Sequence, residues 1–389
     1  MANGAGPDKE AARQLAAQVN SQLEVGAPAA LSFEPITIAE LQQRWLGHHE
    51  DVLRSSVQTI RRYRSATNHL MEFIDRRGTA QSTSHFLTHQ AEEFVRYLRT
   101  VKVAPNGHPK ARTRSLLDKG GKYILMCCRT MFNYAIKRRH LSPYAENPFA
   151  ALDLDRMPVE NSKPITIFSV EEEREFLDAC DDWQLPLFLT LMLTGLRPGE
   201  VTHLLLPDDL DLDAKLLRIR NKPRIGWQVK TRNECEIPLV EPLVNVLRIF
   251  VGESRQGVVF RRRCFEFGTE PPLAGMTKQR LEIEVSERVS RKEVELQRSL
   301  TRQEWLREAQ GVWRDAGMIK NEGVRKEFMR LTHKIGQPQL TAPKSLRHLF
   351  ATCLQDANVD PLIRCELMGH SVGSRNGAAH GLGMTATYT

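Results

Sequence analysis

The chain has 389 residues and a mass of 44.3 kDa, enough for about two to three domains of ordinary size. Hydrophobic residues make up 41% and charged residues 26%, which excludes a largely disordered protein. The longest apolar run, 185–196, contains Pro186 and Gly195 and falls short of the roughly 20 residues of a membrane-spanning helix. The N-terminus lacks the pattern of a secretory signal, so we expect a cytoplasmic protein with no membrane contact. The seven cysteines form no Cys-x-x-Cys pair, which argues against a zinc cluster or a disulfide framework.

The positive charge is concentrated in one part of the chain. The net charge is +8, yet residues 37–150 alone hold 19 Lys and Arg against 9 Asp and Glu. Within that region, residues 101–140 contain ten basic residues and one acid, Asp118. Such a density suits a phosphate backbone. On charge alone, a solvated basic surface explains it equally well.

The first part of the chain is predicted to be a helical bundle behind a disordered arm. Residues 1–36 are rich in Ala, Gly, Pro and Gln, and we predict no structure there. Helical periodicity then begins at Thr37, resumes after Ser55 or Ser56 as a cap, and returns around Phe94 and over 115–139. The bundle is predicted over 37–150, followed by a proline-flanked linker over 151–163.

Residues 164–389 are predicted to form a second domain, mainly helical with a small antiparallel sheet. It opens with a capping box formed by Ser169 and Glu172. Residues 216–220 and 227–239 alternate as two strands around a turn at 221–226. The segment 277–316 has nine basic and eight acidic residues along one apolar stripe, which predicts an exposed, structural helical hairpin or insertion.

The motifs of several common enzyme classes are missing from the chain. The sequence has no P-loop, no His-Glu-x-x-His and no glycine-rich dinucleotide fingerprint. Instead, Arg197 directly precedes Pro198 and is therefore predicted at a helix N-terminus, a position that favours anions. Glu200, one turn further, is predicted to hold its guanidinium.

Four more short sequence motifs contain candidate residues; we call these motifs, together with the one around Arg197, the sequence frames. Lys230 lies on the second predicted strand, and a helix that starts after Pro343 places Lys344 and Arg347 on one face. His370 ends the sequence LMGH, and Tyr388 lies in TATYT. Taken one at a time, each has a structural explanation: a solvated lysine, a helix-terminal arginine or histidine, or an ordinary aromatic residue.

Taken together and in this order, the frames TGLRPGEVTHLLLPDD, VKTRNECEIPL, KSLRHLFAT, LMGH and TATYT resemble the tyrosine recombinase family, also called the phage integrase family. The resemblance covers about residues 165–389, and the basic region 37–150 is similar, more weakly, to the family's SAM-like core-binding domain. It implies a helical core-binding domain and a mixed, mainly α catalytic domain that close as a C-shaped clamp around duplex DNA.

The resemblance also implies an activity and its partners. The protein would be a site-specific DNA recombinase or integrase that cleaves and rejoins DNA through a covalent 3′-phosphotyrosyl intermediate. It would act as a homotetramer on a specific recombination site, at the nucleoid when bound to DNA, with an accessory DNA-bending protein as a candidate partner. No metal or nucleotide cofactor is implied, because the phosphotyrosyl bond retains the energy needed for rejoining.

The residue roles follow from the same resemblance. Arg197 and Arg347 would hold the scissile phosphate, Lys230 would protonate the departing 5′ oxygen, and Tyr388 would be the nucleophile. His370 would bind the phosphate or assist proton transfer. Lys344 stands where the family usually has histidine, so it would bind phosphate rather than act as a base. The candidate DNA contacts of the first domain are Lys110, Arg112, Arg114, Lys119, Lys122 and Arg129.

Two alternatives remain at this stage. A topoisomerase-like enzyme would rejoin the same strand after rotation. A non-catalytic DNA-binding protein would keep the fold and bind DNA without a covalent adduct, which Lys344 and the long glycine-rich segment between His370 and Tyr388 would suit.

Overall fold

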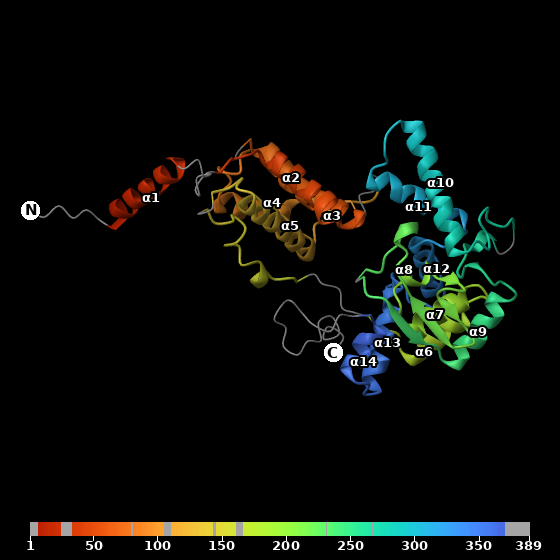
Figure 1. Ribbon diagram of the computed structural model, residues 1–389. Helices are drawn as coiled ribbons and strands as arrows, with labels where there is room; N and C mark the ends of the chain where they lie inside the picture. The colour runs from red at the N-terminus through yellow and green to blue at the C-terminus, as the bar shows by residue number, and fades with distance from the viewer. Residues whose placement is uncertain are drawn as a thin grey trace, which may run out of the picture. The chain divides into compact units, whose positions relative to one another are not determined.

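The computed structural model divides the chain into two compact units, residues 1–163 and 164–389 (Figure 1). The structure describes residues 7–24, 33–78, 81–104, 110–142, 145–160, 166–230, 232–265 and 268–369. Both units are mainly helical, and the strands are short and antiparallel. The predicted fold class is therefore confirmed. Across the described residues, no helix combines the length and the apolar character that crossing a membrane requires.

The first unit is built around four helices. They are α2 (Ile38–Gly47), which continues into a π-helical turn at His48–Val52, α3 (Val57–Arg77), α4 (Thr88–Thr100) and α5 (Asp118–Lys137). Ser56 caps α3 by accepting the N–H of Thr59 at 3.1 Å, and Gly78 ends it at φ +64°. The short strands β1 (Lys102–Val103) and β2 (Arg114–Ser115) pair before α5 begins.

The prediction of a disordered arm over 1–36 is wrong for most of that segment. Residues Pro7–Glu24 form the helix α1, because the run is rich in Ala, Gln, Glu and Leu, which have high intrinsic helix propensity. The end of the segment belongs to the bundle: Ile36 is buried, and the N–H of Glu34 donates to the carbonyl of Arg139 at 2.8 Å.

Part of the segment predicted as a linker packs on the first unit. Leu154, in the 3-10 turn Leu154–Arg156, is buried in the core of the bundle. The N–H of Glu160 donates to the Asp118 carboxylate at 3.1 Å, and Lys122 Nζ reaches the carbonyl of Asp155 at 3.4 Å. Residues 154–160 therefore cover the start of α5.

In the second unit, the helix α7 (Gln184–Thr194) is buried over most of its length. The other helices are α6 (Val170–Asp178), α8 (Pro198–Val201), α9 (Glu241–Val251), α10 (Lys278–Leu296), α11 (Arg302–Asp315), α12 (Asn321–Lys334), α13 (Lys344–Asp356) and α14 (Pro361–Leu367). The strands β4 (Leu210–Asp211), β5 (Leu216–Ile219) and β6 (Cys235–Pro238) form one sheet in that order, and β3 (Leu205–Leu206) pairs with β7 (Gly257–Val258). The buried register pair Leu217 and Ile237 faces the core.

The segment 277–316 forms a helical hairpin. Figure 1 shows α10 and α11 side by side, projecting from the rest of the unit. Their base has its own buried core, in which Leu281, Val285 and Trp313 pack with Ile225 of the turn between β5 and β6. At the far end of α10, Val294 is 78% exposed, whereas α11 packs on the turn at Gly226 through Trp305, Leu306 and Ala309.

Candidate active site

Arg197 lies at the start of α8, where the sequence predicts it, and Glu200 holds it in place. The Arg197 Nη1 atom donates to Glu200 Oε1 at 2.7 Å, and the Arg197 main-chain N–H donates to Glu200 Oε2 at 2.8 Å. The Glu200 side chain is 6% exposed and that of Arg197 is 24% exposed. The carboxylate is therefore buried, while the guanidinium still reaches solvent.

Arg347 joins three of the five sequence frames. It lies on α13 and is only 4% exposed. Its Nη1 donates to the carbonyl of Gly195 at 2.6 Å, and its Nη2 donates to the carbonyl of Met368 at 2.5 Å. The planar guanidinium fork can satisfy two acceptors at once. One side chain thus ties the end of α7 and the end of α14 to α13.

Gly195 makes this approach possible. It ends α7 with φ +61°, in the left-handed region that favours glycine. A Cβ atom at this position would overlap the ring of Phe350 on α13. The absence of a side chain lets α13 come close enough for Arg347 to reach the Gly195 carbonyl.

The first residue of β6 lies beside the same group. Cys235 Sγ is 3.9 Å from the position that a Cβ on Gly369 would take. Burial raises the pKa of the Cys235 thiol to about 11; the charge of Glu200 adds to the rise, and Arg347 and Arg197 oppose it. We call Arg197, Glu200, Arg347 and the carbonyls of Gly195 and Met368 the arginine cluster. Four of the five sequence frames meet there.

Lys230 lies in an exposed turn and not on a strand, so that part of the hairpin prediction is wrong. The Arg232 N–H donates to the Val229 carbonyl at 2.9 Å and closes a turn over 229–232, with Arg232 at φ +61°. Residues 221–234 form a loop of their own that contains the 3-10 turn Pro223–Ile225. Only Cys235–Pro238 pairs with β5. The buried side chain of Val229 anchors the turn.

Lys344 is exposed at the first position of α13, one helical turn before Arg347. His348 is buried next to both residues. Burial lowers the pKa of His348, and the positive charges of Lys344 and Arg347 lower it further. The N-terminal turn of α13 therefore gathers positive potential, which suits an anion.

His370 and Tyr388 lie outside the described residues. The described chain reaches Gly369, directly after the Met368 carbonyl that accepts from Arg347. The described part of LMGH therefore ends beside the arginine cluster, one residue before His370.

The six basic residues predicted to contact DNA lie in the first unit, on β2, on α5 and on the segment just before β2. Arg114 is in β2, opposite Val103. The exposed members are Lys110, Arg112, Arg114 and Lys119, and the half-buried ones are Lys122 and Arg129 on α5. A cation that the sequence does not single out, Arg62 on α3, lies 4.6 Å from the ring centroid of Tyr123 on α5.

We call residues 221–234 the Lys230 loop. Buried polar and aromatic groups pack beneath it. Lys222 and Asp209 form an ion pair of 2.8 Å whose side chains are 2% and 1% exposed. Trp227 stacks on His203 with centroids 4.9 Å apart. Burial lowers the pKa of His203 to about 3, partly opposed by its hydrogen bond to the Gly199 carbonyl.

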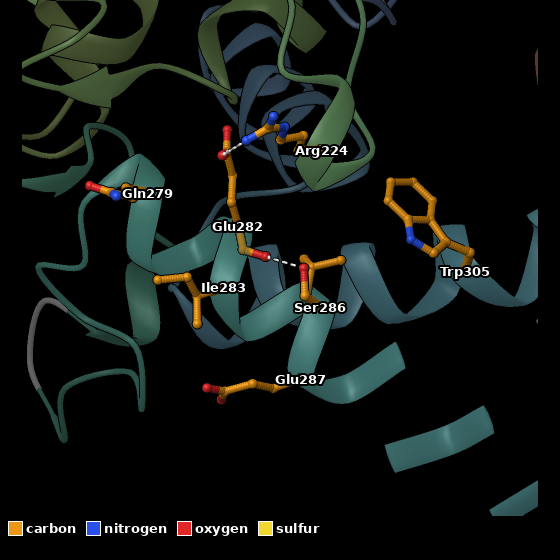
Figure 2. Close-up of a pocket in the computed structure, with 8 residues that line it drawn as sticks. Arg224, Gln279, Glu282, Ile283, Ser286, Glu287 and Trp305 are labelled. Carbon is orange, nitrogen blue, oxygen red and sulfur yellow. Dashed lines mark hydrogen bonds and ion pairs between the residues drawn. The ribbon is translucent and has the colours of Figure 1, made fainter. Parts of the chain in front are cut away.

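The helical hairpin holds the tip of the same loop. The Trp313 indole donates to the carbonyl of Ile225 at 2.7 Å. A cleft of about 510 Å³ lies at this junction, and Trp305 forms part of its wall. Figure 2 shows its lining residues, among which Arg224 pairs with Glu282 on α10. The two side chains are 3.5 Å apart. None of the predicted catalytic residues that the structure describes lines this cleft.

Comparisons with known proteins agree with this geometry. The integrase of transposon Tn1549, in complex with transposon right end DNA, matches with a TM-score of 0.59 and 18% identity over 91% of this chain and 94% of that chain. A lambda integrase dimer bound to a COC′ core site matches with a TM-score of 0.52 and 14% identity over 88% and 100%. A lambda integrase tetramer bound to a Holliday junction gives 0.51 and 15% over 97% and 91%. At such identities the similarity shows a shared fold.

A search of curated proteins finds no match to this chain. The sequence model described as the phage integrase family matches residues 167–375, which is more than half of the chain and includes every residue of the arginine cluster. The chain therefore belongs to the phage integrase family and is a tyrosine recombinase, an enzyme of site-specific DNA cleavage and rejoining.

Proposed function

We propose that Arg197 and Arg347 bind the scissile phosphate of a DNA strand and that Tyr388 attacks it. The observation that carries this proposal is the double hydrogen bond from Arg347 to the carbonyls of Gly195 and Met368. These hydrogen bonds hold two segments next to Arg347: the residues between α7 and α8, which include Arg197, and the end of α14, which leads to His370. Two guanidinium groups match the non-bridging oxygens of a phosphate and stabilise the charge that grows on them during attack.

In the proposed step, the Tyr388 hydroxyl loses its proton and its oxygen bonds to phosphorus, while the bond from phosphorus to the 5′ oxygen breaks. An unperturbed tyrosine has a pKa of about 10, so neighbouring arginines favour the phenolate that attacks. Lys230 donates a proton to the departing 5′ oxygen. His370 hydrogen-bonds the phosphate, and Lys344 adds positive charge. A 5′ hydroxyl from another strand reverses the step and releases the tyrosine.

The proposed partner is duplex DNA with a specific recombination site, bound by several copies of the chain. The DNA complexes of the Tn1549 and lambda integrases support this partner, and the lambda tetramer on a Holliday junction supports a homotetramer. The first unit would act as the core-binding domain, with its six basic candidates on the phosphate backbone. An accessory DNA-bending protein remains a candidate partner, and the expected location is the cytoplasm, at the nucleoid.

A covalent-capture experiment tests the proposal. The purified full chain is incubated with nicked duplex fragments from the DNA that flanks its own coding sequence, then denatured and examined for protein joined to DNA. Wild type is expected to give an adduct and Tyr388→Phe to give none. The matched control is Tyr144→Phe, since Tyr144 is the preceding tyrosine in the sequence, and it is expected to behave as wild type.

The controls distinguish DNA cleavage through Tyr388 from DNA binding without cleavage. Tyr388→Phe should still bind the captured duplex, with an affinity that falls as salt rises. Salt-sensitive binding without an adduct from wild type would contradict the proposed cleavage. An adduct that survives Tyr388→Phe would contradict the choice of nucleophile.

A further inference from the structure

A single side chain pins both ends of the turn that carries Lys230. The Asn221 Oδ1 atom accepts the N–H of Val229 at 2.9 Å, and its Nδ2 donates to the carbonyl of Arg232 at 3.1 Å. Val229 and Arg232 are the two residues that close the turn through their own 2.9 Å hydrogen bond. Lys230 is the first residue between them. The amide of Asn221 thus braces the turn from outside, as asparagine side chains do when they mimic the backbone.

Glu234 completes this brace. Its Oε1 accepts the main-chain N–H of Asn221 at 2.8 Å and the Asn221 Nδ2 at 3.2 Å. Asn221 thus forms hydrogen bonds to residues within 229–234 through its side-chain oxygen, its side-chain nitrogen and its main-chain N–H. The carboxylate fixes the orientation of the amide, so the two residues act as one unit.

The base of the brace is itself held by buried contacts. Asn221 stands between β5, which ends at Ile219, and Lys222, whose buried ammonium pairs with Asp209 at 2.8 Å and donates to the Arg220 carbonyl at 3.2 Å. Beyond Lys222, the loop is held by Trp313 and by the contact of Arg224 with α10 that Figure 2 shows. The turn is exposed, but its supports are tied to the core of the unit.

We propose that Asn221 and Glu234 are positioning residues that set the place of Lys230 for proton donation to the 5′ oxygen. This inference rests on the proposed role of Lys230. A general acid must come within hydrogen-bond reach of the atom that it protonates, and small displacements of such groups cost much of the rate. Lys230 is a long, exposed side chain, so the backbone that carries it must be fixed if the ammonium is to find the leaving oxygen.

The test changes the leaving group. The nicked duplex recovered by covalent capture is synthesised in two forms, with oxygen or with sulfur as the 5′ bridging atom of the scissile phosphate. A thiolate leaves without a proton, because thiols have a pKa of only about 8.5. On the oxygen duplex, Lys230→Ala is expected to slow adduct formation by about 100-fold and Asn221→Ala by about 10-fold. On the sulfur duplex, both variants are expected to react within about 2-fold of wild type, because no proton donor is needed.

A matched pair of carboxylate variants guards against misfolding. Glu234 directly precedes β6 and Glu236 lies two residues further on, but Glu236 pairs only with arginines among the contacts that the structure describes, Arg218 at 3.3 Å and Arg220 at 3.7 Å. Glu234→Ala is expected to slow the oxygen duplex by about 3-fold with rescue by sulfur, whereas Glu236→Ala stays within about 2-fold of wild type on both. Thermal unfolding of every variant is measured in parallel.

The outcomes distinguish a failure of the proposed role of Lys230 from a failure of the positioning role of Asn221. If wild type forms no adduct, or if Lys230→Ala is equally slow on both duplexes, the proposed role of Lys230 fails and this inference falls with it. If Lys230→Ala is rescued by sulfur but Asn221→Ala reacts at the wild-type rate on oxygen, or is equally slow on both duplexes, Asn221 does not position Lys230. If Asn221→Ala does not fold, the result from Glu234→Ala decides between the same outcomes.

Discussion

The arginine cluster and the Lys230 turn are built in opposite ways. Arg347 is 4% exposed and is held by two main-chain carbonyls from distant parts of the chain. Lys230 is exposed, and its turn is held at the surface by the amide of Asn221. A buried arginine must be hydrogen-bonded to be tolerated, so the same side chain contributes to stability and to the proposed binding of phosphate. In the turn, by contrast, a change of position should alter chemistry with little effect on stability.

The two regions also differ in how they respond to pH. The cations of the cluster are arginines, a residue type that is not deprotonated in proteins. The Lys230 loop rests on groups that titrate: burial raises the pKa of Asp209 and lowers that of Lys222, and their mutual attraction offsets part of each shift. His203 lies below Trp227 of the same loop. Acid should therefore weaken the support of the turn before it alters the charge of the two arginines.

The largest effect is expected for Arg347→Ala. The substitution removes the donor from two buried carbonyls, each of which costs about 1–3 kcal/mol when its hydrogen bond is lost. The free energy of unfolding should fall by about 3–5 kcal/mol once the lost packing of the side chain is included. Covalent adduct should fall by more than about 100-fold, as for the loss of a donor to a developing oxyanion. Urea unfolding and covalent capture measure the two effects.

Arg220→Ala is the matched control for this change. Arg220 directly follows β5 in the same unit, its side chain is 48% exposed, and it pairs with Glu236 at 3.7 Å. Its removal should cost less than about 1 kcal/mol and leave the adduct unchanged. If the two variants were equally stable, the cluster would not be part of the core, and the contrast with the Lys230 turn would disappear.

Gly195→Ala should disturb the cluster without removing a charge. An alanine at φ +61° costs about 1–2 kcal/mol, and its Cβ would also overlap the ring of Phe350. Relieving such overlap adds about 1–3 kcal/mol, so a total loss of about 2–5 kcal/mol is expected. The Gly195 carbonyl would shift away from Arg347, and the rate of adduct formation should fall with the stability.

Gly336→Ala separates the two causes. Gly336 follows α12 at φ +73°, and a Cβ there would meet nothing within 4 Å. Only the cost of the backbone conformation remains, about 1 kcal/mol, and the adduct should form at the wild-type rate. Equal losses for the two glycines would show that the approach of α13 to Gly195 is not tight.

Local parts of the candidate site could be predicted because local chemistry determines them. Pro198 and the spacing to Glu200 define the cap that holds Arg197, and the structure has both hydrogen bonds. The capping box of α6 was equally predictable, with Ser169 and Glu172 exchanging hydrogen bonds at 2.8 and 3.2 Å. These contacts span three residues, so the sequence contains all the information that they need.

Contacts over long distances could not be predicted in the same way. Arg347 binds main-chain carbonyls, which every residue has, so nothing in the sequence marks Gly195 and Met368 as its partners. Alternation over 227–239 suggested a strand, but a loop with one buried residue, Val229, produces the same pattern. Asn221 directly after β5 was the available sign of a braced turn. Low apolar periodicity predicts no structure over 1–36, whereas the high helix propensity of the residues in 7–24 is enough for α1 to form.

The smallest effect concerns the support of the turn in acid. Because burial lowers the folded-state pKa of His203 from 6.5 to about 3, the unfolded chain binds this proton first as pH falls. The stability that the neutral imidazole contributes is present above pH 6.5 and is lost as pH falls below it, down to about 3. Between about pH 7 and pH 5, wild type should lose about 2 kcal/mol more unfolding free energy than His203→Gln, which cannot titrate. His333→Gln, at an exposed site on α12, should lose stability in parallel with wild type. If His203→Gln and wild type instead lost stability equally, the acid sensitivity would not lie beneath the turn, and the two regions would not differ in their response to pH.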